Sequence, residues 1–286
     1  MKKFNWKNLI ILLGGILILF GFSYWVKEVF KGKIQIDPIA FSFGPFKIYW
    51  YGILIATSFL IGFLLILKEA KKRNYNQEHL INLVFWGTLA GFLGARTIFV
   101  LLQLNYFIQN PLEIFKISKG GLSIHGALLF GFIAIYLYCL KYKLSFLKFA
   151  DLFTPFILLG QGISRWGNFI NQELIGYPTN LPWKMWVKEE LRPKEFISYS
   201  FFHPVFLYES IICLLGFLIF YYLLSKKIRS GSLFFGYILY YSIGRFLVEI
   251  FRIEPRIIFH LSLAQIVSIG LIIISLICLL KIKKSH

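Results

Sequence analysis

The sequence predicts an all-α, polytopic integral membrane helix bundle with about eight transmembrane helices. Hydrophobic residues occupy 58% of the 286 positions and charged residues only 15%, whereas a soluble domain carries about a quarter charged residues. Water cannot solvate so much apolar surface, and a hydrocarbon core of about 30 Å takes about 20 apolar residues per helix. The three cysteines all fall inside apolar runs, so we interpret them as small helical hydrophobes.

Eight apolar stretches are predicted to span the membrane. The first resembles a signal peptide, but its apolar run is long and no small-residue cleavage site follows it, so we expect a retained helix. The fourth and fifth are short, and one of them could be partly re-entrant. The predicted spans cover residues 8–26, 49–67, 81–101, 124–140, 151–163, 204–224, 232–250 and 261–280.

Lysine and arginine are distributed unevenly between alternate loops. The set that includes both termini holds 16 of them in 43 residues, and the alternate set holds 13 in 94. The denser set is predicted to face the cytoplasm, which puts both termini inside and the loop 164–203 outside. The net charge of +18 then mainly reflects the orientation of the chain in the membrane. It also favours contact with anionic bilayer lipids. No nucleic acid partner is expected.

Ionisable residues within the spans or at their outer ends are the candidate functional groups. Burying such a group costs at least about 2.5 kcal/mol, so it is seldom present without a purpose. Most of these residues are predicted to lie toward the outer side, and Asp151 is the exception. They are Arg96, His125, Asp151, Arg165, Glu173, His203, Glu209, Arg245, Glu249 and Arg252.

The seventh predicted span carries a polar stripe. Its members are spaced i, i+4, i+8 and i+11, within about 80° of one helix face. They are Tyr241, Arg245, Glu249 and Arg252. Arg245 and Glu249 could simply neutralise each other, but the second arginine leaves surplus positive charge, which suits a phosphate.

His125 follows Gly120 and Gly121 at the outer start of the fourth span. Glycine permits turns and close approaches that other residues forbid. A lone histidine at a helix start is usually just a hydrogen-bonding residue, and a functional role is an equally open alternative. The sequence contains no metal-ligand cluster and no phosphate-cradling glycine loop of the nucleotide type, so no metal and no cofactor are expected.

The segment GQGISRWGNFINQELIG, residues 160–176, resembles the signature of bacterial phosphatidylglycerol–prolipoprotein diacylglyceryl transferases. The recurring pattern is Gly-Arg-x-Gly-Asn-Phe-x-Asn-x-Glu-x-x-Gly, and Ser164 replaces its first glycine. The matching residues are Arg165, Gly167, Asn168, Phe169, Asn171, Glu173 and Gly176. Other blocks agree in order, from about residue 37 to the C-terminus: YWYG at 49–52, GARTIFV at 94–100, GGLSIHGALLFG at 120–131, HPVFLYE at 203–209 and GRFLVEIFR at 244–252. Ala127 stands where the family usually has a second glycine after the histidine.

The resemblance implies an enzyme of the bacterial plasma (inner) membrane. It would transfer the diacylglyceryl group of phosphatidylglycerol to the lipobox cysteine thiol of a prolipoprotein, forming a thioether and releasing glycerol phosphate, in the first step of lipoprotein maturation. Its partners would be phosphatidylglycerol, the lipobox peptide and bilayer lipids. One alternative is a transporter or channel with an intramembrane Arg/Glu site, against which stands the lack of an internal repeat. A second alternative is a non-catalytic lipid-binding scaffold.

The resemblance also implies roles for residues. Arg165 and Arg245 are expected to hold the leaving phosphate. His125 is the candidate base for the thiol, and an arginine field that lowers the thiol pKa is the rival. Asn168 and Glu173 are expected to bind phosphatidylglycerol or to fix Arg165. The other expected lipid-binding residues are Tyr51 and Tyr241, and the expected partners that orient the arginines are Glu209, Glu249 and Arg252.

The family usually has seven spans, so the first helix looks like an addition. We expect residues 1–36 to form this extra helix and an outer loop. Residues 37–286 would form the transmembrane catalytic domain, with an extracytoplasmic loop or head at 164–203.

Overall fold

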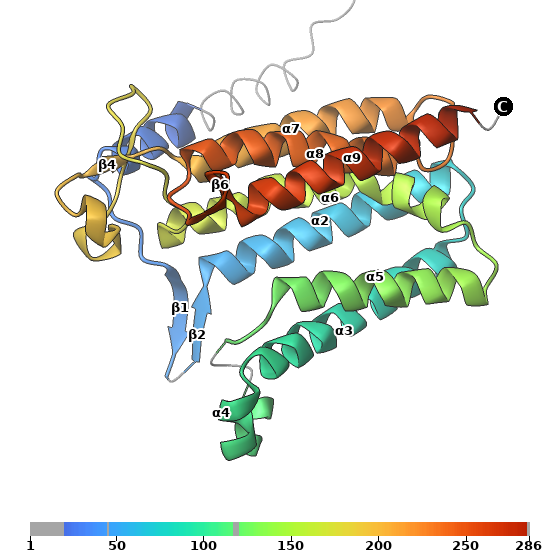
Figure 1. Ribbon diagram of the computed structural model, residues 1–286, viewed down its shortest axis with the longest axis horizontal. Helices are drawn as coiled ribbons and strands as arrows, with labels where there is room; N and C mark the ends of the chain where they lie inside the picture. Colours follow the sequence, from blue (N-terminus) through green and yellow to red (C-terminus); the bar gives the residue numbers. More distant parts are fainter. Residues whose placement is uncertain (1–19, 45, 117–119, 285–286) are drawn as a thin grey trace, which may run out of the picture.

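The computed structural model describes residues 20–44, 46–116 and 120–284, and most of them are helical (Figure 1). Seven helices among these residues are long and apolar enough to cross a membrane. They are α2 (Trp50–Lys72), α3 (Gln77–Leu102), α5 (Ile124–Lys141), α6 (Phe146–Asn171), α7 (Val205–Leu224), α8 (Ser232–Val248) and α9 (Leu263–Lys284). Most of the predicted first span, 8–26, lies outside the described residues.

Helix α6 is longer than the predicted span 151–163, and its 26 residues continue through Pro155 without interruption. The polar residues that suggested a loop, Arg165 and Asn168, therefore lie on its last two turns. Their side chains donate hydrogen bonds to Tyr241 and Glu173 of the protein, so their polarity does not end the helix. The described residues of the fourth and fifth predicted spans contain no re-entrant segment, since α5 and α6 are each one unbroken helix.

One end of the bundle carries the non-helical structure and is called the head end (Figure 1). The loop 172–204 between α6 and α7, called the head, lies there, shorter than the predicted 164–203. Three antiparallel β-ribbons, which the sequence did not predict, are also found there with the short helix α4 (Leu104–Gln109). The ribbons pair β1 (Ile39–Phe43) with β2 (Phe46–Tyr49), β3 (Met185–Trp186) with β4 (Phe201–Phe202), and β5 (Arg256–Ile258) with β6 (Leu261–Ser262).

The opposite end, called the basic end, consists of three short loops and the end of α9. These loops, 73–76, 142–145 and 225–231, join consecutive helices, and Figure 1 places the C-terminal end of the chain there. Every described spanning helix therefore connects the head end to the basic end, in alternating directions.

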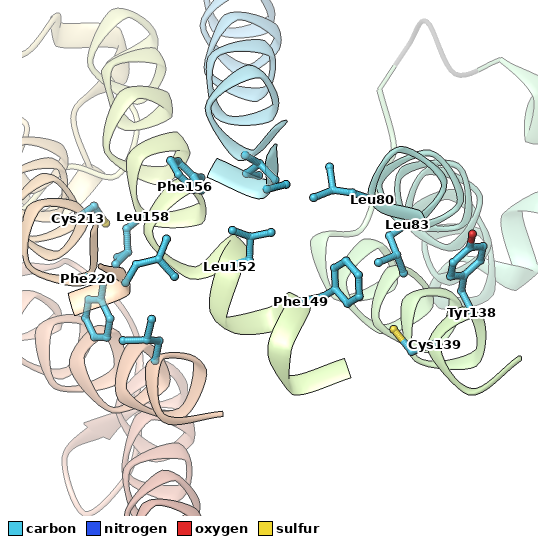
Figure 2. Close-up of a cluster of buried hydrophobic side chains, with 14 residues drawn as sticks. Leu80, Leu83, Tyr138, Cys139, Phe149, Leu152, Phe156, Leu158, Cys213 and Phe220 are labelled. Carbon is cyan, nitrogen blue, oxygen red and sulfur yellow. The ribbon is translucent and has the colours of Figure 1, made fainter. Parts of the chain in front are cut away.

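Helix α6 is the central element of the bundle. Half of its most apolar stretch is buried, against 17% to 33% in the other six spans. Figure 2 shows Phe149, Leu152, Phe156 and Leu158 of α6 within a cluster that reaches from Leu80 of α3 to the helices on its other side. Buried apolar side chains at these positions join the two sides of the bundle through one helix.

Helices α3 and α5 pack as a close pair. A Cβ added to Gly126 would overlap the carbonyl oxygen of Gly94, so only glycine permits this approach of the two backbones. The contact lies one residue after His125, and it fixes the start of α5 although Ala127 replaces the family's second glycine.

Residues 20–30 form a helix that packs at the head end. Val29 and Phe30 are buried in a second apolar cluster with Phe169 of α6 and Phe206 of α7. The ring centroids of Phe30 and Phe169 lie 5.6 Å apart. The described part of the N-terminal segment thus supports the end of α6 that carries Arg165.

Asp151 lies at the basic end, as expected, and its carboxylate caps another helix. Its Oδ2 accepts a hydrogen bond of 2.6 Å from the Gly231 amide, and its Oδ1 accepts one of 2.8 Å from the Phe234 amide. Gly231 is the N-cap residue of α8 and has no side chain with which to cap it. Asp151 therefore satisfies amide groups that the start of α8 would otherwise leave without acceptors.

Replacing Asp151 with alanine is expected to lower the free energy of unfolding by about 1–3 kcal/mol, because two amides lose their acceptor. Asp151→Asn, which keeps one acceptor oxygen, should lose less. Denaturant unfolding in micelles measures both. The matched control is Asp37→Ala, since Asp37 is exposed and makes one local bond to the Ile39 amide. Equal stability of Asp151→Ala and the unmodified protein would contradict the capping role.

Candidate functional site: an arginine–glutamate cluster between two cavities

Three helices bring the predicted arginines together around one carboxylate. Glu209, in the second turn of α7, is only 3% exposed. Its Oε2 lies 2.5 Å from Nη2 of Arg165 on α6, and its Oε1 pairs with Nη1 of Arg245 on α8. Arg165 also donates a hydrogen bond of 3.4 Å to the Tyr241 hydroxyl. The two guanidinium groups therefore converge on opposite oxygens of the same buried acid.

Glu249 holds the other side of Arg245. Its Oε2 lies 2.9 Å from Nη2 of Arg245, which precedes Glu249 by four residues, or about one helical turn. Arg252 was expected on the same helix face, but the α-helix ends at Val248 and Arg252 has an extended backbone. Its side chain nevertheless returns to the cluster, 3.7 Å from both Glu209 and Glu249, while its strongest pair is with Glu254 at 2.6 Å.

Three residues after α8 complete the cluster, and the sequence did not single them out. Ser262 donates a hydrogen bond of 2.9 Å to Oε1 of Glu249. Arg256 donates one of 3.3 Å to the Glu249 carbonyl and one of 2.8 Å to Gln265. These residues belong to the β5–β6 ribbon and the start of α9, and no periodic pattern in the sequence marks them as neighbours of Glu249.

The cluster is unequally accessible. Its side-chain exposure is 21% at Arg165 and 17% at Arg245, but only 8% at Arg252 and 4% or less at Glu209 and Glu249. Four guanidinium groups (Arg165, Arg245, Arg252 and Arg256) face three carboxylates (Glu209, Glu249 and Glu254), which leaves one net positive charge. Of the three arginines that pair with Glu209, Arg165 and Arg245 are therefore the ones that an incoming anion can reach.

Arg165 lies in the wall of a cavity of about 850 Å³. Tyr51, Asn168 and Tyr241 line the same cavity, and most of the remaining wall is apolar side chains of α2, α5, α6 and α9 such as Phe59, Leu128, Ile157 and Leu271. An apolar chamber with a guanidinium group in its wall suits a molecule that joins acyl chains to an anionic group.

Arg245 lies in the wall of a second cavity, of about 530 Å³. His125 lines this cavity together with Glu249, Tyr241 and Ser242. Tyr241, Ser242 and Leu271 line both cavities, so the two chambers meet at α8. Ser242 is a wall residue of both that the sequence did not identify.

Arg96, one of the ionisable candidates, positions the segment before His125. Its guanidinium donates hydrogen bonds of 2.6 Å to the Glu113 carbonyl, 2.8 Å to that of Ile114 and 2.9 Å to that of Gly121. A guanidinium group carries five N–H donors, so one side chain can bind several backbone carbonyls at once. Arg96 is therefore a structural clamp on the loop that leads into α5.

Asn168 and Glu173 contact each other at the end of α6. The Asn168 amide donates a hydrogen bond of 3.2 Å to Glu173, and Asn171 donates one of 3.0 Å. Neither contacts Arg165, which Glu209 and Tyr241 hold instead. Asn168 still lines the larger cavity. The glycine between it and Arg165 has a packing role, because a Cβ on Gly167 would overlap the ring of Tyr51.

His203 lies apart from the arginines. Its Nδ1 is 2.9 Å from the Tyr208 hydroxyl, and its backbone pairs with the Tyr177 segment of the head. Burial lowers the pKa of His203, so its ring is uncharged at neutral pH. Among residues 20–44, 46–116 and 120–284 no group of three or more His, Cys, Asp or Glu could hold a metal ion.

Comparison with known proteins identifies a family to which this chain is similar. A family model described as prolipoprotein diacylglyceryl transferase matches residues 38–281. Three relatives bear the name phosphatidylglycerol–prolipoprotein diacylglyceryl transferase. The relative from Thermotoga petrophila is 41% identical to this chain, and the match covers 91% of this chain and 90% of the relative. The relative from Synechocystis sp. is 40% identical, and the match covers 87% of this chain and 90% of the relative. The relative from Staphylococcus haemolyticus is 41% identical, and the match covers 86% of this chain and 88% of the relative.

The family match begins and ends close to the limits that the motifs predicted, and the relatives cover nearly the whole chain. The predicted resemblance is therefore confirmed. This multi-pass membrane protein belongs to the prolipoprotein diacylglyceryl transferase family, whose reaction is diacylglyceryl transfer from phosphatidylglycerol to a prolipoprotein cysteine.

Proposed function

We propose that the arginine–glutamate cluster is the active centre at which this chain transfers the diacylglyceryl group. The observation that carries this proposal is the sharing of Glu209 by Arg165 and Arg245 at the meeting of two cavities. A buried carboxylate holds two guanidinium groups at a fixed separation, each with an edge open to a different cavity. This arrangement suits a phosphodiester that must be gripped while one of its ester bonds breaks.

Phosphatidylglycerol occupies the larger cavity in this proposal. Its acyl chains lie along the apolar wall and its phosphate reaches Arg165 and Arg245, with Tyr51, Asn168 and Tyr241 beside the headgroup. The developing negative charge on the leaving phosphate is then stabilised by guanidinium groups that burial has already oriented. Glu209 and Glu249 set that orientation and do not touch the lipid.

The prolipoprotein cysteine approaches through the second cavity, where His125 lies. The sulfur forms a bond to the terminal glycerol carbon of the diacylglyceryl group as that carbon's bond to the phosphate oxygen breaks. The electron pair leaves on glycerol phosphate, and the thiol proton passes to the His125 ring. The rival route has no dedicated base, and the arginine field alone lowers the thiol pKa.

The proposed location is the plasma membrane of a bacterium, with the head end on the outer face and both chain termini in the cytoplasm. The density of lysine and arginine in the loops of the basic end supports this orientation. Residues 37–286 then form the catalytic domain, and the head lies where a secreted peptide reaches the membrane surface.

Arg165→Ala and Arg245→Ala are each expected to lower the transfer rate at least about 100-fold, since each removes a donor to the leaving phosphate. Arg165→Lys keeps the charge but not the planar, two-pronged geometry, so it should recover only part of the rate. The measurement is the diacylglyceryl mass increment on a lipobox peptide incubated with phosphatidylglycerol vesicles and the purified protein.

Arg229→Ala is the matched control for these variants. Arg229 lies at the basic end, where it donates hydrogen bonds to the carbonyls of Ile282 and Lys283, and its loss should leave the rate within a factor of two or so. Full activity of Arg245→Ala would remove the phosphate grip from the mechanism.

His125→Ala should lower the rate about 100-fold or more if the ring is the base, because general base catalysis contributes on that scale. The loss should shrink when the assay pH is raised toward the pKa of a free thiol, since more thiolate then forms without help. His79→Ala is the control, because His79 contacts the Tyr138 hydroxyl far from the cluster. A rate equal to that of the unmodified protein would leave only the field mechanism.

Orientation is tested by thiol labelling in spheroplasts with a membrane-impermeant reagent. Lys194→Cys in the head should react in intact spheroplasts, and Lys227→Cys at the basic end only after permeabilisation. Both lysines are exposed, and the background carries Cys278→Ser because the other two cysteines are buried. The reverse labelling pattern would refute the proposed topology.

A further inference from the structure

The basic end contains a cavity of about 690 Å³ that the transfer reaction does not use. It lies among the loops 73–76, 142–145 and 225–231, at the far ends of α2, α3, α6 and α8 from the arginine–glutamate cluster. Its floor is apolar and includes Phe149, Leu152 and Leu233, which belong to the buried cluster of Figure 2. The cavity therefore lies between the apolar core of the bundle and the charged loops of the basic end.

The wall of this cavity is strongly cationic. Arg73, Lys143, Lys148 and Lys226 line it, against one carboxylate, Asp151. That carboxylate already accepts two backbone hydrogen bonds from the start of α8. Lys143 and Lys148 have no ion-pair partner within the described residues. Arg73, Lys143 and Lys226 come from three separate loops and Lys148 from the first turn of α6, so the fold gathers these cations around one cavity.

Two buried polar atoms of the wall also lack partners in the described structure. Ser230 Oγ and Arg73 Nε make no hydrogen bond there. Arg73 Nε has a carboxylate oxygen of Glu69 at 3.5 Å, but this contact is an ion pair without a hydrogen bond. Buried donors of this kind are normally satisfied, and each costs free energy when it is not. A ligand with several acceptor oxygens would satisfy both.

We propose that this cavity binds the phosphate headgroup of an anionic phospholipid in the leaflet at the basic end. The enrichment of lysine and arginine in cytoplasmic loops is enough to explain why lysines lie in these loops. It does not explain why they surround a cavity whose wall contains buried donors without acceptors. The volume is far larger than one phosphate ion requires and lies in the range of sites for whole small molecules. The apolar floor favours a ligand that has an apolar part as well as a charge. Basic pockets between helix ends are suited to such headgroups.

The probe is a photoreactive phosphatidic acid with the reactive group near its headgroup, incorporated with the full-length protein into phosphatidylcholine nanodiscs. The yield of cross-linked peptides that cover residues 143–152 is measured against the fraction of probe. Lys143→Gln with Lys148→Gln should weaken this labelling about 30-fold, since each lysine near an anionic headgroup contributes about fivefold.

Lys71→Gln with Lys227→Gln is the matched control. It removes the same charge from the same end, but neither lysine lines the cavity, so labelling should stay within about twofold. Equal losses in the two double variants would overturn the proposal, because labelling would then report only the charge of this end. Unchanged labelling of Lys143→Gln with Lys148→Gln would overturn it too.

Competition separates a lipid from a free anion. Unlabelled phosphatidic acid should displace the probe, whereas inorganic phosphate in excess should not. Displacement by inorganic phosphate at the same concentration would overturn the lipid assignment. If the double variant fails to fold, Lys226→Gln gives an independent test with a lysine from another loop, and about fivefold weaker labelling is expected.

Discussion

The buried carboxylate of Glu209 is the interaction on which the functional part of the structure depends. An unpaired carboxylate at 3% exposure inside a membrane helix bundle would be strongly unfavourable. Its stability requires Arg165 and Arg245, and these come from the two helices that flank α7. The same constraint acts in reverse, because both guanidinium groups would be costly without the acid. Charge neutralisation therefore fixes how α6, α7 and α8 align at the head end.

Close backbone packing makes that alignment possible. Gly167 accepts the ring of Tyr51, so α2 can lie against the turn of α6 that carries Arg165. The Ser210 hydroxyl donates a hydrogen bond of 2.8 Å to the Gly162 carbonyl, which ties α7 to α6 one residue beyond Glu209. In a bilayer, where lipid tails are as apolar as side chains, small residues and buried hydrogen bonds of this kind hold helices together. The glycines of the 160–176 motif are thus part of the site's geometry.

The sequence predicted the seven spanning helices found among the described residues, because apolar length is a local property. It failed where the outcome depends on which helices meet. The end of α6 looked like a loop because Arg165 and Asn168 are polar, and only the position of Glu209 on another helix shows why Arg165 can remain helical. Arg252 looked like the fourth member of a helical stripe, yet the helix ends four residues earlier. Ser262 and Arg256 reach Glu249 through a ribbon that has no periodic signal.

The acids in the cluster also bear on product release. Four arginines around a phosphate without carboxylates would bind lipid and glycerol phosphate alike, and such uniform binding does not speed the chemical step. Glu209, Glu249 and Glu254 reduce the cluster to one net positive charge. If the cluster is the active centre that we propose, its grip on a ground-state phosphodiester with one negative charge is moderate, and the charge that develops as the ester bond breaks meets guanidinium edges already oriented toward it. An active centre of this composition would favour the breaking bond more than the resting lipid, and would release glycerol phosphate more readily than four unpaired arginines.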